Sequence, residues 1–467
     1  MLHKFVENAF FISILVTATL TYAETVFSSK PSLCWNYCKK CNDDNSALTL
    51  TTAATQTLEE YILVIDAGSR GSRIHVYRFT VCNGIYRLED EDFDELKPGL
   101  SYYNTRPIEA AKSLDPLLEF AIEKVPQELQ DRTPIVVKAT AGLRSLNKKE
   151  SDAILDAVRS RLKNEYPFSI AKDGVGILSG EDEAVYGWIT ANYLLCRLNS
   201  KKPHNTVAAF DLGGTSTEIA FELRPGDERP RNGDKNQITK VATKEDVFTL
   251  YENSYSSFGH EEARIKIYEK ILKDKGNLNL EMVEHPCIPP GQKKKVSLTI
   301  DGDTQDYTFV GPHSSEYKIC KLIIESVLQK DSNCQYDNCG FNGLWQPKFD
   351  QAFPNGDIYL SHEFHDRIHP LGISSSFKLK KLHPYEKLIC SGKAGWNKLN
   401  DKLVEMLKDD PEYCMVLMYI SLLLERGYEI PKNRQVTVAK RVFGIELGWP
   451  LAVALLSFQL AVEFPPE

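Results

Sequence analysis

The sequence has no Asn-x-Ser or Asn-x-Thr sequon for N-linked glycosylation. Eukaryotic secreted proteins of this size usually carry several such sites, so their absence favours a bacterial source. The chain also lacks an uninterrupted apolar run of about 20 residues, the length that a membrane-spanning helix needs. We therefore expect no stable membrane span. An excess of basic residues is missing as well: 64 acidic against 56 basic side chains give a net charge of −8, which argues against a nucleic-acid-binding protein.

The amino terminus has the layout of a secretory signal. Lys4 supplies positive charge, residues 9–20 are apolar, and Ala23 suits a cleavage site. We expect residues 1–23 to be a signal peptide and residues 24–57 to be a polar linker or a small extension that contains three cysteines. This layout predicts a secreted or periplasmic protein.

The chain contains eleven cysteines, which in a secreted protein indicate disulfide bonds. The odd number leaves at least one thiol without a partner within the chain. The sequence does not give the pairing of five of them: Cys34, Cys38, Cys41, Cys82 and Cys196.

Two segments of the chain share one plan. Residues 61–65 form a short apolar run that ends at Asp66, and a turn rich in glycine and serine leads into a second strand-like segment. Residues 206–210 repeat the pattern up to Asp211. Short continuous apolar runs are typical of buried strands, and alternating strands and helices indicate α/β domains. Two copies of one unit facing each other across a cleft would bring both aspartates to the same place.

The two turns suit the binding of phosphate. Glycines let the backbone approach a ligand closely, and successive N–H groups form a concavity for an anion. A carboxylate beside phosphate is unfavourable unless a cation lies between them. Asp66 and Asp211 are therefore candidates for a Mg²⁺ or Ca²⁺ site, in which Mg²⁺ would keep several waters. The alternative is that each aspartate only caps its turn, but two such turns in register favour the phosphate site.

Hydrolysis of phosphate also needs a group that orients and deprotonates water. Three acidic residues, Glu181, Asp182 and Glu183, lie at the start of a helix predicted over 180–195, with Ser179 as its N-cap. Acidic residues favour helix N-termini for electrostatic reasons alone. Chemistry by itself does not choose among the three.

Five segments together resemble the apyrase family of ecto- and secreted nucleoside triphosphate diphosphohydrolases. The resemblance covers residues 60–462, and the segments follow the order of the family. They are residues 66–73, 138–144, 180–188, 211–217 and 444–449. The family implies an α/β fold of two actin-like (ribonuclease H-like) domains with the active-site cleft between them. We expect domain I to comprise residues 58–171 plus 436–467, and domain II residues 172–435.

The resemblance also implies roles for single residues. It identifies Glu183 as the catalytic base and Ser216 as a residue that holds the attacking water. Asp66, Asp211 and Trp449 would bind the water shell of Mg²⁺ or Ca²⁺. The phosphate-binding residues would be Ala67, Gly68, Ser69, Arg70, Gly71, Ser72, Arg73, Thr140, Arg144, Leu212, Gly213, Gly214, Thr215 and Ser216.

Further expectations concern the second domain and two departures from the family pattern. Tyr419 and Phe364 would hold the nucleotide base between their rings. Glu218 stands where glutamine is usual, and Arg70 stands where a small hydroxyl residue is more common. The resemblance also orders six cysteines into three disulfides: Cys287–Cys320, Cys334–Cys339 and Cys390–Cys414.

These features predict a monomeric, metal-dependent hydrolase that releases terminal phosphates from nucleoside di- or triphosphates. One alternative is a nucleoside diphosphatase restricted to GDP and UDP. Another is an exopolyphosphatase-like hydrolase, because the second phosphate loop of such proteins also ends in Ser-Thr-Glu. A nucleotide-binding module without activity is disfavoured, since binding alone does not need a carboxylate that activates water.

Overall fold

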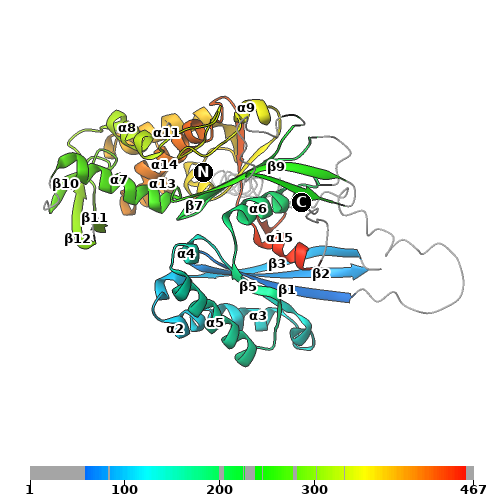
Figure 1. The fold of residues 1–467 in the computed structure, drawn as a ribbon. Coiled ribbons are helices and arrows are strands. Elements are labelled where there is room, and N and C mark those ends of the chain that lie inside the picture. Colours follow the sequence, from blue (N-terminus) through cyan, green and yellow to red (C-terminus); the bar gives the residue numbers. More distant parts are fainter. Residues whose placement is uncertain are drawn as a thin grey trace, which may run out of the picture.

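The computed structural model describes residues 58–458, apart from 83–84, 199–203, 225, 227–236, 244–245, 277–280, 301 and 331. The expected signal peptide and the cysteine-containing extension lie outside the described residues. Helices and strands alternate along the chain, which confirms the α/β class. Figure 1 shows one sheet in each half of the molecule, with helices α6 (Gly180–Leu194) and α15 (Pro450–Ser457) between them.

The first domain is built on a five-stranded sheet in the order β3-β2-β1-β4-β5. Strand β1 pairs antiparallel with β2 and parallel with β4. Residues 61–67 of β1 are all buried, as expected for a central strand covered on both faces. The strands are β1 (Leu58–Ala67), β2 (Ser72–Cys82), β3 (Ile85–Leu96), β4 (Pro134–Ala139) and β5 (Ser169–Ile177). The helices are η3 (Leu100–Tyr103), α2 (Pro107–Lys112), α3 (Asp115–Lys124), η4 (Gln127–Arg132), α4 (Ala141–Arg144) and α5 (Lys148–Glu165).

The second domain repeats this plan. Its seven-stranded sheet has the order β14-β15-β13-β6-β7-β9-β8, and β6 pairs antiparallel with β7 and parallel with β13. The pairing of β6 therefore matches that of β1, which confirms the internal repeat around Asp66 and Asp211. The strands are β6 (Ala208–Leu212), β7 (Ser216–Glu222), β8 (Ile238–Ala242), β9 (Val247–Ser256), β13 (Ile358–His362), β14 (Ser376–Lys378) and β15 (Gln435–Val438).

Helices of the second domain cover this sheet. They are α7 (His260–Lys275), α8 (Tyr317–Val327), α9 (Phe349–Ala352), α10 (Glu363–Ile368), η5 (His369–Leu371), η6 (Leu379–Lys381), α11 (Leu382–Cys390), α12 (Lys393–Trp396), α13 (Asp401–Asp409), α14 (Tyr413–Leu422) and the π-helical turn η7 (Leu423–Gly427). A smaller sheet of this domain comprises β10 (Met282–Glu284), β11 (Lys293–Ile300) and β12 (Asp303–Val310). The two-stranded sheet of β16 (Arg441–Val442) and β17 (Ile445–Glu446) contacts β3 of the first domain, where the Glu446 backbone N–H donates to Glu91.

The sheet topology moves both expected domain boundaries. The boundary at 171/172 falls inside β5, whose residues 175–177 still pair with β4. The boundary at 435/436 falls inside β15, which pairs with β13 of the second domain. The first domain therefore extends to residue 177, and the chain leaves the second sheet only after residue 438. The sequence misplaced both points because strand pairing depends on partners that are distant in sequence.

Three disulfides join the expected cysteines, all in the second domain. They are Cys287–Cys320, Cys334–Cys339 and Cys390–Cys414, which confirms the implied pairing. Cys196 is disulfide-bonded as well. Among the described residues, no helix combines the length and the apolar character that a membrane span requires.

Candidate active site

A cavity of about 390 Å³ lies between the two domains, where the two glycine-rich turns face each other. The first turn joins β1 to β2, and the second joins β6 to β7. Most of the expected site residues line this cavity: Asp66, Gly68, Ser69, Arg70, Gly71, Ser72, Arg73, Thr140, Glu183, Asp211, Leu212, Gly213, Gly214, Thr215, Ser216 and Trp449. The repeat thus brings together side chains from five separate segments, as the sequence predicted.

Asp66 ends β1 and is almost completely buried at 6 % exposure. Its Oδ2 accepts a hydrogen bond from Nη1 of Arg73 over 3.1 Å, while its Oδ1 has no hydrogen-bond partner among the described residues. Burial alone would lower the pKa of Arg73. The negative charges of Asp66 and two glutamates outweigh burial, so the pKa of Arg73 is raised. The Asp66 carboxylate therefore has one oxygen that is hydrogen-bonded and one buried oxygen without a hydrogen-bond partner among the described residues.

Asp211 has the equivalent place at the end of β6. Its Oδ1 accepts a hydrogen bond from Nδ1 of His362 over 2.7 Å. Burial alone would lower the pKa of His362, but the Asp211 carboxylate outweighs it and raises that pKa to about 9. His362 is thus protonated at neutral pH. Its backbone has φ 52° and ψ −123° at the junction of β13 and α10, a conformation that non-glycine residues rarely adopt and that often marks functional sites.

The second turn is fixed by close backbone packing against the start of α7. Backbone N–H groups of Gly259 and His260 donate to the carbonyl oxygens of Thr215 and Gly213 over 2.9 and 3.0 Å. Gly259 has no room for a side chain, because a Cβ atom there would overlap Gly214. The glycine pair holds the turn close to the helix, so the backbone of the second loop is preorganised around the cavity.

Glu183 lies in the first turn of α6, where Oγ of Ser179 accepts the Asp182 backbone N–H over 2.9 Å. Of the three acidic residues at this helix start, only Glu183 lines the cavity. Its Oε2 accepts a hydrogen bond from Nη2 of Arg144 over 2.9 Å. Burial, and then the nearby Glu218 carboxylate, raise the pKa of Glu183 well above its usual range, against the effect of Arg144.

Glu218 is a site residue whose role the sequence did not reveal, although its departure from the family pattern drew attention to it. The side chain is buried, and its Oε1 accepts a hydrogen bond from Oγ of Ser254 over 2.8 Å. Burial and the Asp211 charge raise the pKa of Glu218 to about 7. Glu183, Asp211 and Glu218 together line a second cavity of about 20 Å³, which is large enough for about one water molecule.

Other residues of the large cavity were not assigned a role from the sequence. His260, Glu363 and Arg367 line it and come from segments outside the five family motifs, so only the fold brings them to the site. Glu446 also lines the cavity and lies within the motif 444–449. It is buried, and its Oε2 has no hydrogen-bond partner among the described residues.

Four expected site residues do not line the cavity. Ala67 is buried within β1, and Arg144 lies behind Glu183, where its Nη1 also donates to the Leu178 carbonyl over 2.7 Å. Arg144 therefore contacts the expected base rather than the phosphate site. Tyr419 and Phe364 are 1 % and 0 % exposed in the core of the second domain. The structure does not support their role in base binding, because a ring without an accessible face cannot stack on a base.

The cavity fits a hard cation that keeps its water shell. Among the residues that the structure describes, no group of three or more His, Cys, Asp or Glu side chains is arranged to ligate a metal directly. Asp66, whose buried Oδ1 has no hydrogen-bond partner among the described residues, and Asp211 nevertheless line the same cavity. Carboxylate oxygens are the ligands that Mg²⁺ and Ca²⁺ prefer, and Mg²⁺ usually keeps several waters.

The sequence matches the GDA1/CD39 (nucleoside phosphatase) family over residues 52–462. It is similar to the guanosine-diphosphatase of Candida albicans, with 41 % identity covering 85 % of this chain and 70 % of that protein. The guanosine-diphosphatase of Saccharomyces cerevisiae is 39 % identical, covering 86 % of this chain and 81 % of that protein. Apyrase 1 of Arabidopsis thaliana is 31 % identical, covering 85 % and 84 %.

The structure is similar to a nucleoside triphosphate hydrolase from Neospora caninum, with a TM-score of 0.62 and 15 % identity over 86 % of this chain and 92 % of that one. The likeness confirms the fold of two actin-like domains. The sequence relatives named here come from fungi and a plant, so they give no support to a bacterial source. The family match over most of the chain, with two relatives near 40 % identity, shows that this protein belongs to the GDA1/CD39 family of nucleoside phosphatases.

Proposed function

We propose that this protein is a nucleoside diphosphatase that hydrolyses GDP and UDP in preference to triphosphates. The relatives named guanosine-diphosphatase are 39 to 42 % identical, whereas those named apyrase or probable apyrase are 31 to 33 % identical. This favours the narrower alternative over the broad tri- and diphosphatase that the motifs first suggested. An exopolyphosphatase-like activity has no comparable support in a family of nucleoside phosphatases.

The proposal rests on the position of Glu183, which lines the same cavity as the two glycine-rich turns that can hold phosphate. Residues 68–72 and 212–215 line the cavity, and backbone N–H groups of such turns can hold the two phosphates of a diphosphate. With the terminal phosphate held there, the open Oε1 of Glu183 is the acceptor for a proton of the attacking water, and the Ser216 hydroxyl can orient that water. The water oxygen then bonds to the terminal phosphorus, while the bond between that phosphorus and the bridging oxygen breaks. The products are inorganic phosphate and a nucleoside monophosphate.

A divalent cation bound beside Asp66 and Asp211 would neutralise charge on the phosphate oxygens. The residues of this chain provide its setting: the open oxygen of Asp66, the carboxylate of Asp211 and the indole of Trp449 all line the cavity. Arg73 and His362 donate hydrogen bonds to the two aspartates and orient both carboxylates. We also propose that the protein acts in an oxidising compartment, an assignment that its disulfides support.

The test is phosphate release from GDP, UDP, ADP, GTP, ATP and polyphosphate at equal concentrations, with Mg²⁺ or Ca²⁺ present. We expect kcat/KM for GDP and UDP to exceed that for ATP and GTP by at least about tenfold, a difference of about 1.4 kcal/mol in transition-state binding. Equal values of kcat/KM for ATP and GDP would instead support the broad apyrase function. Cleavage of polyphosphate alone would overturn the proposal.

A further inference from the structure

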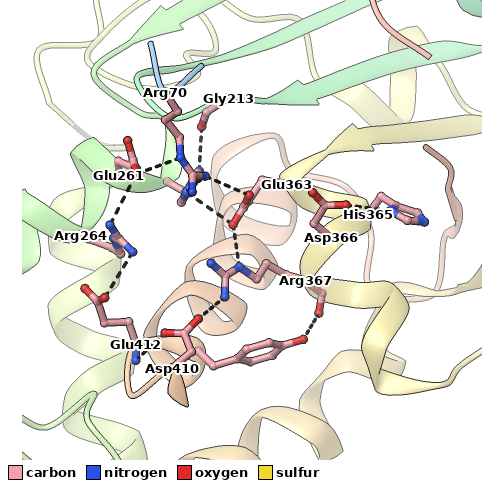
Figure 2. A network of polar contacts seen from close by, with 12 residues as sticks. Arg70, Gly213, Glu261, Arg264, Glu363, His365, Asp366, Arg367, Asp410 and Glu412 are labelled. Carbon is pink, nitrogen blue, oxygen red and sulfur yellow. Dashed lines mark hydrogen bonds and ion pairs between the residues drawn. The ribbon is translucent and has the colours of Figure 1, made fainter. Parts of the chain in front are cut away.

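Arg70 crosses the cleft in this structure. It belongs to the first phosphate loop, between β1 and β2, yet its guanidinium contacts His260, Glu363 and Glu261, which all belong to the second domain. Figure 2 shows it between Glu261 of α7 and Glu363 of α10. The apyrase family that the sequence resembles more commonly has a small hydroxyl residue at this position, and such a side chain could not form these ion pairs.

Three acceptors hold the guanidinium. Nε lies 3.1 Å from Oε1 of Glu261, and Nη1 lies 3.5 Å from Oε2 of Glu363. Nη1 also lies 3.1 Å from Nε2 of His260. Burial lowers the pKa of His260, and its Nδ1 lies 3.0 Å from the Gly213 carbonyl. The neutral ring therefore donates from Nδ1 and accepts from Arg70 at Nε2.

The two carboxylates are themselves held in position by the second domain. Oε1 of Glu363 accepts from Nε of Arg367 over 2.6 Å, and Arg367 also pairs with Asp410. Burial alone would raise the pKa of Glu363, but its interactions with His260, Arg367 and Arg70 outweigh burial and lower that pKa. Glu261 lies 3.7 Å from Arg264, which pairs with Glu412 over 3.4 Å. Both carboxylate acceptors of Arg70 are thus held in place by cations of the second domain before any ligand enters.

The Arg70–Glu261 pair lies beside the second phosphate loop. A Cβ atom on Gly214 would be 3.2 Å from Cδ of Arg70 and 3.1 Å from Oε2 of Glu261. Arg70, Gly214 and Glu363 all line the cavity. A guanidinium binds a phosphate with the same planar set of donors that it uses for a carboxylate. A phosphate in the loops and the Glu261 carboxylate therefore compete for one cation.

We propose that Glu261 restrains Arg70 and that the incoming polyphosphate takes Arg70 from it. The inference rests on the proposed function, because it concerns the phosphate groups of that same substrate. In the free enzyme the ion pairs link the two domains across the cavity. On binding, Arg70 exchanges a carboxylate for phosphate oxygens, and the link to α7 is released. The exchange weakens binding of substrate and product, since each must displace Glu261.

The experiment is a double-mutant cycle with Glu261→Gln, Arg70→Ser and the double variant, each assayed for KM with GDP and for the dissociation constant of inorganic pyrophosphate by calorimetry with Mg²⁺. Glu261→Gln should lower both constants by about two- to fivefold, the range of a half-exposed ion pair. Arg70→Ser should raise both. In the Arg70→Ser background, Glu261→Gln should change neither, because the cation that it restrains is gone. Glu262→Gln, on the next residue of α7, is the matched control and should leave both constants unchanged.

Each outcome decides between interpretations. A rise in KM and in the pyrophosphate constant on Glu261→Gln would mean that Glu261 positions Arg70 for binding, which overturns the restraint. An equal effect of Glu261→Gln with and without Arg70 would also overturn it. If the wild-type protein does not hydrolyse GDP but the pyrophosphate constants follow the cycle, the diphosphatase proposal fails and the restraint stands. If pyrophosphate does not bind to the wild-type protein, the proposed restraint of Arg70 is overturned.

Discussion

Arg144 donates a hydrogen bond from Nη2 to Oε2 of Glu183 over 2.9 Å, and this contact joins the first domain to helix α6. Nη1 of the same guanidinium donates to the Leu178 carbonyl over 2.7 Å, just before α6 begins. The two bonds fix the carboxylate of Glu183 while leaving its Oε1 open. Arg144 thus acts on the reaction through Glu183, whose orientation and charge it controls.

The first prediction concerns the pH dependence of turnover. A base works only when deprotonated, and the pKa of Glu183 is raised well above its usual range. Turnover should therefore fall as pH drops through this raised pKa. Because Arg144 lowers the pKa of Glu183, Arg144→Gln should move the acidic limb of the kcat profile to higher pH by about one unit or more. An acidic limb that stays in place in this variant would show that Arg144 has no electrostatic role.

The second prediction tests Glu183 itself. Glu183→Gln keeps the size of the side chain and can still accept the hydrogen bond from Arg144, but it cannot take a proton from water. We expect kcat to fall by at least about 10²-fold, with nucleotide binding and melting temperature nearly unchanged. Glu181→Gln is the matched control, since Glu181 does not line the cavity. If both variants kept wild-type turnover, another group would activate the water, and Asp211 would be the next candidate.

Local patterns in the sequence were sufficient to predict the inner half of the site. Asp66 and Asp211 each follow an apolar run and precede glycines, so the repeat of strand, aspartate and turn could be recognised without a structure. The structure confirms that both aspartates line one cavity. His362 and Glu363 could not be found in this way. They lie on a strand end and a short helix of six residues, and only the pairing of β13 with β6 brings them beside Asp211.

The structure gives no support to the base-binding prediction, and the sequence contains the reason. All ten residues of α14, Tyr413 to Leu422, are buried, and a helix that is apolar all round belongs in a core. Only the resemblance indicates that Tyr419 binds the base, whereas the apolar pattern of the helix predicts that it is buried. Phe364 lies on α10, where neighbouring Glu363, Asp366 and Arg367 line the cavity while the phenyl ring points into the core. A single aromatic residue in a polar segment packs inward more readily than it faces water.

The third prediction concerns the cation. Excess EDTA should abolish phosphate release, and Mg²⁺ or Ca²⁺ should restore it. Asp66→Asn should raise the concentration of Mg²⁺ that gives half-maximal rate, because the open Oδ1 loses its charge. Asp156→Asn on the exposed face of α5 makes the same chemical change far from the cavity and should leave that concentration unchanged. Full activity of the wild-type protein in EDTA would reject the cation site.

The fourth prediction ranks two disulfides by the length of chain that they close. Cys390–Cys414 spans 24 residues and joins α11 to α14, whereas Cys334–Cys339 spans 5 residues in a loop. Loop-closure entropy predicts a loss of about 3.5 kcal/mol in unfolding free energy for a double alanine variant of the first and about 2 kcal/mol for the second. Denaturant unfolding under oxidising conditions measures both. A larger loss for the short loop would show that native contacts rather than chain entropy dominate.

The last prediction concerns the pH dependence of stability and a glutamate outside the active site. Glu252 lies on β9 and is 1 % exposed. Its Oε1 accepts from Thr239 over 3.3 Å, and its Oε2 has no hydrogen-bond partner among the described residues. Burial, and then the charge of Glu181, raise the pKa of Glu252 from 4.5 to about 8.

Between these two pKa values the folded protein binds a proton at Glu252 that the unfolded chain has released. The free energy of unfolding therefore falls as pH rises through this window, and the loss is complete above about pH 8. Glu252→Gln removes the ionisable group and keeps the hydrogen-bonding amide. We expect the variant to match the wild type near pH 4.5 and to gain about 1–3 kcal/mol at pH 9, the usual magnitude for an uncompensated buried polar group. The exposed Glu119→Gln is the control and should show no such trend. A gain that is equal at both pH values would come from packing, and would show that the charge of Glu252 does not limit stability.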